Sequence, residues 1–183
     1  MSTLLLTHGA GSNRNAPLLV AIASALTDAG VDVLRYDLPF RQKRPHGPPR
    51  PGDAVADRAG LREQIEALRD RGPVVLSGVS YGGRQASILA SEEPQLVAGL
   101  LLLSYPLHPP GKPGQLRTAH LPGLQLPVLF VHGSRDPFGS LEEMEAAIRL
   151  IPGRTRLVPI QGAGHDLKGA APAAVAAFQE FFK

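Results

Sequence analysis

One stretch of the chain constrains its fold more than any other. Residues 74–84 read Val-Val-Leu-Ser-Gly-Val-Ser-Tyr-Gly-Gly-Arg, so an apolar run typical of a strand stops at Gly-x-Ser-x-Gly and a helical pattern begins at once. This is the sequence form of a nucleophile elbow, a sharp strand-to-helix turn that carries a serine. Glycine suits positions Gly78 and Gly82 because a side chain there would collide with the turn or the neighbouring strand. The pattern predicts that Ser80 projects its hydroxyl above the carboxyl edge of a sheet.

Strand-like and helix-like segments alternate along the rest of the sequence. We expect six strands, at residues 4–7, 31–36, 74–79, 97–103, 128–131 and 155–160. We expect the main helices to begin near Asn15, Asp53 (as a cap), Gly83, Ser140 and Pro172. This alternation predicts a three-layer α/β fold, with a mostly parallel sheet of about six strands covered by helices on both faces. The length of 183 residues predicts a single domain over residues 1–183.

Two segments rich in proline and glycine interrupt the alternation. Residues 40–52 are expected to form a long exposed loop, because no regular element runs through so many prolines. The basic residues of its Arg41–Arg50 stretch are interpreted as solvated, although they also suit the attraction of an anionic substrate or of a partner protein. Residues 105–124 are expected to form a second loop, with a short helix near residues 115–120.

Composition narrows the classes of protein that remain. The longest apolar run is far shorter than 18 residues, and the N-terminus lacks the basic and apolar regions of a signal peptide, so we expect neither a membrane span nor secretion. The net charge is only +3, which disfavours a nucleic-acid partner. The chain has no cysteine, and its histidines and acids lack metal-ligand spacing, so we expect no metal and no other cofactor. A cytoplasmic location is the default.

An acid and a histidine follow later strands of the predicted sheet. Asp136 lies one short loop after residues 128–131, and His165 lies one glycine-rich loop after residues 155–160. Histidine can take the proton of a serine hydroxyl, and a carboxylate behind it fixes the imidazole tautomer. Because carboxyl ends of parallel strands share one edge, we expect Ser80, His165 and Asp136 to meet there as a catalytic triad.

Each member of this set also has a plainer interpretation. Asp136 before Pro137 is typical of a turn, His165 can pair with the adjacent Asp166, and Ser80 fits a helix N-cap. The three positions together favour catalysis, because all follow strand ends in the order serine, acid, histidine.

Attack by a serine on a carbonyl also requires donors for the developing oxyanion. The backbone N–H groups of Tyr81 and of Ala10 or Gly11 are the candidates, the latter two in the loop His8-Gly9-Ala10-Gly11. We interpret His8 as a structural hydrogen-bonding residue at the base of that loop. Further candidates for substrate binding are Gly11, Arg84 and His108, with Lys112, Arg117 and His120 on the same loop as His108.

At these residues the chain resembles the α/β-hydrolase superfamily. More narrowly, it resembles a small dienelactone-hydrolase-like family that includes the hydrolase-like domain of a nuclear acetyltransferase-complex subunit and a testis-expressed relative. The segments that carry this similarity are residues 7–11, 82–84, 105–112 and 132–139. The resemblance implies the hydrolase fold with Ser80, Asp136 and His165 in the catalytic roles. Compared with larger relatives, we expect the N-terminal antiparallel hairpin and a cap domain to be missing.

Two functions remain open from the sequence. The first is a serine hydrolase that acts through an acyl-enzyme on a small ester, thioester or amide. The second is a binding or scaffold module that keeps the hydrolase fold without turnover. An intact set of three matched loops favours the enzyme.

Overall fold

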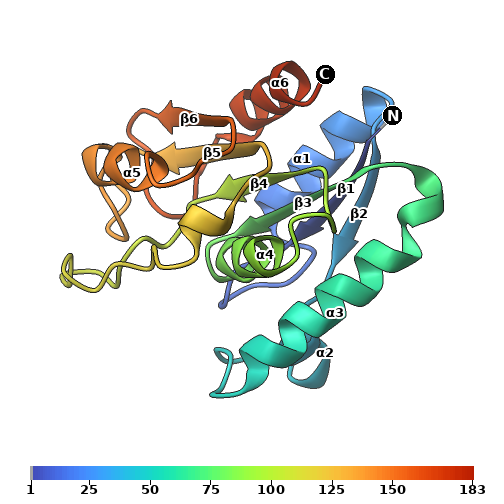
Figure 1. The fold of residues 1–183 in the computed structure, drawn as a ribbon, viewed down its shortest axis with the longest axis horizontal. Helices are drawn as coiled ribbons and strands as arrows, with labels where there is room; N and C mark the ends of the chain where they lie inside the picture. The colour runs from blue at the N-terminus through green and yellow to red at the C-terminus, as the bar shows by residue number, and fades with distance from the viewer. Residues whose placement is uncertain (1) are drawn as a thin grey trace.

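The computed structural model describes residues 2–183 and contains one sheet of six parallel strands in the order β2-β1-β3-β4-β5-β6 (Figure 1). The strands are β1 (Thr3–Thr7), β2 (Asp32–Tyr36), β3 (Val74–Val79), β4 (Gly99–Leu103), β5 (Val128–Gly133) and β6 (Thr155–Ile160). The predicted fold class is therefore confirmed. Since all six strands run in the same direction, their carboxyl ends form a single edge of the sheet.

Helices cover both faces of the sheet (Figure 1). The α-helices are α1 (Pro17–Asp28), α2 (Pro39–Lys43), α3 (Asp53–Ala67), α4 (Tyr81–Glu92), α5 (Leu141–Ile148) and α6 (Ala171–Phe181). Helices α1 and α6 pack on one face, where their apolar side chains form a core with the strands, and α3, α4 and α5 pack on the other. The central strands are apolar on both sides because each side faces helices: in β1, Leu4 and Leu6 enter one core and Leu5 the other.

The expectation that residues 40–52 form a long exposed loop is wrong for the first residues of this segment. Residues 39–43 form the short helix α2, which Pro39 can begin because its missing N–H falls in the first turn. The Phe40 side chain is buried in the core, and the Arg41 side chain is buried as well. The prolines therefore end this helix rather than preventing it.

Other boundaries differ by smaller amounts. The short helix expected near residues 115–120 is absent, and a 3-10 turn forms instead at Leu121–Gly123. Helix α4 begins at Tyr81, directly after the serine. Asp53 is the first residue of α3 and does not cap it, because Gly52 occupies the cap position at φ 90°. The Asp53 carboxylate accepts the Arg50 N–H and pairs with Arg44.

Within residues 2–183, each helix is too short or too polar to span a lipid bilayer.

Three histidines tie loops to the sheet and its helices. His8 Nε2 accepts the Leu38 N–H at 3.0 Å, and His132 Nε2–H donates to the Gly139 carbonyl at 2.8 Å. His120 Nε2 lies 2.8 Å from the Ser87 hydroxyl. Burial lowers the pKa of all three imidazoles, and that of His120 falls to about 4 with help from the nearby Arg84 guanidinium.

These lowered pKa values make the fold sensitive to acid. An imidazole that is harder to protonate when folded stabilises the protein fully above its ordinary pKa of about 6.5, and this stabilisation is lost as the pH falls toward the folded value. We expect unfolding free energy to decrease between pH 7 and pH 5, by up to about 2 kcal/mol from His120 alone. Urea denaturation at both pH values measures this. The decrease should be smaller in His120→Gln than in the wild type, and an equal decrease in the two proteins would contradict the assignment.

Candidate active site

Ser80 lies in a strained turn between β3 and α4. Its backbone has φ 50° and ψ −114°, a region that residues with a side chain rarely adopt. The Ser80 N–H donates to the Leu103 carbonyl at 2.8 Å, and the Ser80 carbonyl accepts the Arg84 N–H at 2.9 Å. The turn is thus fixed both to the end of β4 and to the first turn of α4.

The glycines of the motif allow the backbone to fold back on itself. A Cβ atom at Gly78 would overlap the backbone of Gly82 and Gly83, and a Cβ atom at Gly82 would overlap the His8 carbonyl oxygen. Both obstacles are backbone atoms, which cannot move aside as a flexible side chain does. The requirement for glycine here is therefore one of space, as the sequence predicts.

Ser80, His165 and Asp136 come together in one hydrogen-bonded line. His165 Nε2 lies 2.8 Å from the Ser80 hydroxyl oxygen. On the other side of the ring, His165 Nδ1 lies 2.8 Å and 3.0 Å from the two carboxylate oxygens of Asp136. With Nδ1–H donating to the carboxylate, the Nε2 atom is free to accept the serine proton.

The loops after β5 and β6 hold the acid and the histidine in place. The Asp136 side chain is completely buried, and its Oδ1 atom also accepts the Phe138 N–H at 2.8 Å. The Phe138 ring stacks on the His165 imidazole with centroids 4.0 Å apart. The Arg135 N–H donates to the Ala163 carbonyl, which joins the two loops directly. Phe138 is thus a positioning residue that the sequence did not single out.

The candidate oxyanion donors lie on either side of Ser80 in the structure, in the loop after β1 and at the first residue of α4. Ala10 and Gly11 line a cavity with Ser80 and His165, and Gly9 approaches the elbow closely, since a Cβ atom there would lie 3.6 Å from Ser80 Cβ. Tyr81 is the first residue of α4, so its N–H has no partner within the helix. Neither the Ala10 nor the Tyr81 N–H donates a hydrogen bond to an acceptor among residues 2–183.

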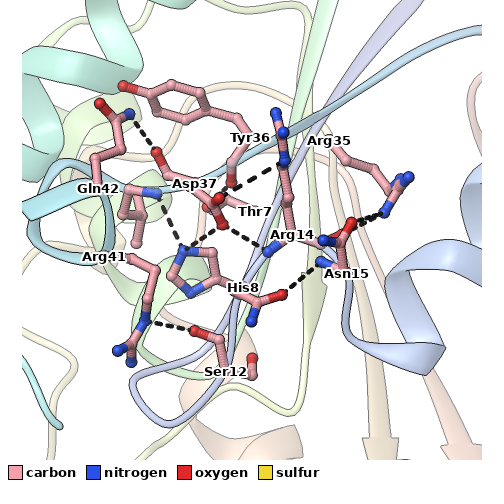
Figure 2. Close-up of polar contacts among 12 residues, drawn as sticks. Thr7, His8, Ser12, Arg14, Asn15, Arg35, Tyr36, Asp37, Arg41 and Gln42 are labelled. Atoms are coloured by element: carbon pink, nitrogen blue, oxygen red, sulfur yellow. Dashed lines mark hydrogen bonds and ion pairs between the residues drawn. The ribbon is translucent and has the colours of Figure 1, made fainter. Parts of the chain in front are cut away.

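The buried side chain of Arg41 supports the loop that carries the candidate oxyanion donors Ala10 and Gly11. Arg41, in α2, donates from Nη2 to the Ala10 carbonyl at 2.8 Å. Its Nε donates to the Ser12 carbonyl, also at 2.8 Å (Figure 2). It also donates to the carbonyls of Arg44 and Gly47. The expectation that Arg41 is solvated is therefore wrong, because four carbonyl groups replace water around its charge. Burial of this residue was not visible in the sequence, where it belongs to a basic, proline-rich run.

His8 anchors the same loop at its base, in agreement with its predicted structural role. The ring is fully buried, its Nδ1–H donates to the Gly9 carbonyl at 2.8 Å, and its Nε2 accepts from the Leu38 N–H. The carboxylate of Asp37 lies 3.6 Å from Nε2. Burial keeps the pKa of His8 below its ordinary value, so the ring is neutral in this arrangement.

The second candidate donor, Tyr81, is held by Asp57 of α3. The Tyr81 hydroxyl donates to Asp57 Oδ2 at 2.7 Å, and the Phe40 N–H donates to Oδ1 of the same carboxylate at 2.9 Å. Asp57 is fully buried, and burial raises its pKa. Burial and the neighbouring Asp57 also raise the pKa of the Tyr81 hydroxyl, which therefore stays protonated and able to donate. Asp57 is a second contributor that the sequence did not reveal.

The cavity over Ser80 has a volume of about 980 Å³. It lies between the loop after β1, the start of α1 and the loop that carries His165. Apolar side chains line much of it, among them Leu18, Val79, Phe138 and Leu167. Such a lining suits an apolar acyl group whose carbonyl carbon reaches the Ser80 hydroxyl.

The predicted substrate-binding residues divide into two groups. Gly11 lines the cavity, whereas Arg84 and His108 do not. His108 is nearly buried and lies 3.2 Å from the Glu143 carboxylate through Nε2. In the described part of the chain, no three histidines or acids are grouped so as to hold a metal ion.

The sheet topology, together with a strained serine at the turn into α4, defines the class of α/β hydrolases. Residues 1–176 match the family described as "Alpha/beta hydrolase domain", and the chain belongs to this family.

Solved structures with the same fold include hydrolases from several bacteria. A putative hydrolase of the alpha/beta superfamily from Xanthomonas campestris is 26% identical, with a TM-score of 0.72 over 99% of this chain and 97% of that one. Dienelactone hydrolase from Anabaena variabilis is 24% identical, with a TM-score of 0.77 over 99% and 87%. A thermophilic esterase from Thermogutta terrifontis is 22% identical, with a TM-score of 0.78 over 100% and 89%. The narrower resemblance to the acetyltransferase-complex relatives stays a prediction.

The crowding at the elbow leads to a direct test. Gly78→Ala should lower the free energy of unfolding by about 3 kcal/mol or more, because the added methyl group meets backbone on two sides. Gly114→Ala is the matched control, since a Cβ atom there meets nothing within 4 Å. Chemical denaturation of the two variants measures the difference. Equal stability of both would show that the turn has room to relax.

Proposed function

We propose that this protein is a serine hydrolase that cleaves a small ester, thioester or amide through an acyl-enzyme. The observation that carries the proposal is the hydrogen-bonded line from Ser80 through His165 to the buried Asp136. A serine hydroxyl becomes a competent nucleophile only when a base within hydrogen-bond reach removes its proton. The family match and the esterase and dienelactone hydrolase among the structural neighbours support a hydrolase.

The first half of the reaction forms the acyl-enzyme. Ser80 Oγ attacks the ester carbonyl carbon while His165 Nε2 takes the hydroxyl proton, and Asp136 stabilises the resulting imidazolium. The N–H groups of Tyr81 and Ala10 donate to the oxyanion that develops on the carbonyl oxygen. Collapse of this tetrahedral intermediate breaks the bond to the alcohol oxygen, which receives the proton from His165.

The second half releases the acid. A water molecule gives a proton to His165 as its oxygen attacks the acyl carbon, and the proton returns to Ser80 as the acid leaves. The apolar lining of the cavity favours an acyl group without charge near its carbonyl. The proposed partner is thus a small-molecule ester, and a scaffold without turnover is the alternative that the next test addresses.

Hydrolysis of p-nitrophenyl acetate and butyrate tests the proposal. We expect saturable turnover by the wild-type protein and a loss of at least about a thousandfold in kcat for Ser80→Ala, because the nucleophile itself is removed. Ser91→Ala, on the same helix, is the control and should keep full activity. If the wild type and Ser80→Ala hydrolyse a broad panel of esters equally slowly, the protein is not a serine hydrolase.

The buried contact between Arg41 and the Ala10 carbonyl predicts a distinct kinetic effect. Arg41→Met should lower kcat by about tenfold or more and change KM little, because the loop that carries the oxyanion donor loses its support. Lys43→Met, an exposed change on the same short helix, should leave both constants near wild type. Both variants are assayed below their unfolding temperatures. A rise in KM with unchanged kcat would assign Arg41 to substrate binding instead.

A further inference from the structure

A group of basic side chains lies on the face of α4 that packs against the segment between β4 and β5. It comprises Arg84 of α4 with Arg117 and His120 of that segment, and we call it the basic cluster. Arg84, Arg117 and His120 are each partly exposed. The residues that line the cavity over Ser80 include none of the three, so the basic cluster is a separate site.

Hydrogen bonds hold the basic cluster together. The Ser87 hydroxyl donates to the Arg84 carbonyl at 2.9 Å and therefore accepts from His120 Nε2–H at 2.8 Å. The buried Tyr105 lies beside His120, with ring centroids 6.4 Å apart, and its hydroxyl donates to the Arg117 carbonyl at 2.6 Å. Arg117 is further fixed by a bond from its guanidinium to the Pro106 carbonyl at 3.1 Å. These bonds fix the backbone of Arg84 and Arg117 and the guanidinium group of Arg117.

The positive charges of the basic cluster have no counter-charge in the structure. Within residues 2–183, neither Arg84 nor Arg117 forms an ion pair, and Arg84 Nε is buried without a hydrogen-bond acceptor. Burial lowers the pKa values of Arg117 and His120, and the positive charge of the nearby Arg84 lowers both further. Glu143, which contacts the same loop through His108, already accepts the Ser140 N–H.

We propose that the basic cluster binds a small oxyanion, a phosphate or carboxylate group, between the guanidinium groups of Arg84 and Arg117. Two guanidinium groups that repel one another and have no counter-charge within residues 2–183 are unfavourable side by side, and an anion between them removes this repulsion. Guanidinium groups bind planar or tetrahedral oxyanions through paired N–H donors, which makes phosphate and carboxylate the fitting chemistry. The anion is either free in solution or part of a longer substrate.

The first arm of the test measures binding and does not depend on catalysis. Inorganic phosphate is titrated by calorimetry into the wild-type protein at constant ionic strength, up to about ten millimolar, where a site with Kd of about 1 mM is filled. We expect saturable binding, at least tenfold weaker affinity in Arg84→Gln and in Arg117→Gln, and no change in Arg149→Gln, an exposed arginine of α5's C-terminal end. Without phosphate, Arg84→Gln should be at least as heat-stable as wild type.

The second arm distinguishes a free anion from one carried by a substrate, and it rests on the proposed esterase activity. The ratio of kcat/KM for mono-p-nitrophenyl esters of dicarboxylic acids of increasing length, from succinate to sebacate, to that for p-nitrophenyl butyrate is compared in the wild type and Arg84→Gln. If the ratio is at least tenfold lower in Arg84→Gln than in the wild type, the site binds a carboxylate carried by the substrate. If the ratio is the same in both proteins while the wild type binds phosphate, the site binds a free anion. If phosphate does not bind and the ratio is unchanged, or if both variants bind phosphate like the wild type, the site does not exist.

Discussion

The close approach of backbone to backbone at the elbow is the constraint on which the remaining structure depends. Gly78, Gly82 and Gly83 let the start of α4 fold against the end of β3, and Gly82 in turn contacts the carbonyl of His8. This crowding leaves Ser80 only its strained conformation, with the hydroxyl raised over the carboxyl edge of the sheet. The strain costs of order 1–3 kcal/mol, and the packed strands around the turn offset it.

The short helix α2 connects both sides of the candidate oxyanion hole. Arg41 holds the loop that contains Ala10, while the Phe40 N–H shares the Asp57 carboxylate with the Tyr81 hydroxyl. The same segment supplies the Leu38 N–H that His8 accepts. A buried arginine and a buried aspartate are costly unless their hydrogen bonds are made, so this region has little freedom to shift. The geometry around Ser80 is therefore set by residues that do not touch the reacting atoms.

The sequence predicted the parts of the structure that follow from local patterns. The strand-to-helix change around Ser80, the capping box at Ser140 and the apolar strands identify the fold, and topology then places Ser80, Asp136 and His165 at one edge. The sequence did not predict the features that depend on contacts between residues far apart in the chain. Nothing local distinguishes the buried Arg41 from its exposed neighbour Lys43, and Asp57 has the pattern of a solvated helix residue until Phe40 and Tyr81 are placed beside it.

The reactivity of Ser80 toward a fluorophosphonate probe is the most direct measurement of the central claim, which is that His165 activates this hydroxyl. Intact-protein and peptide mass spectrometry should find a single adduct, located on Ser80, with labelling strongly slowed in His165→Gln although that variant keeps the serine. An unlabelled wild-type protein, or labelling that proceeds at the same rate when His165 is replaced, would contradict an activated serine at this turn.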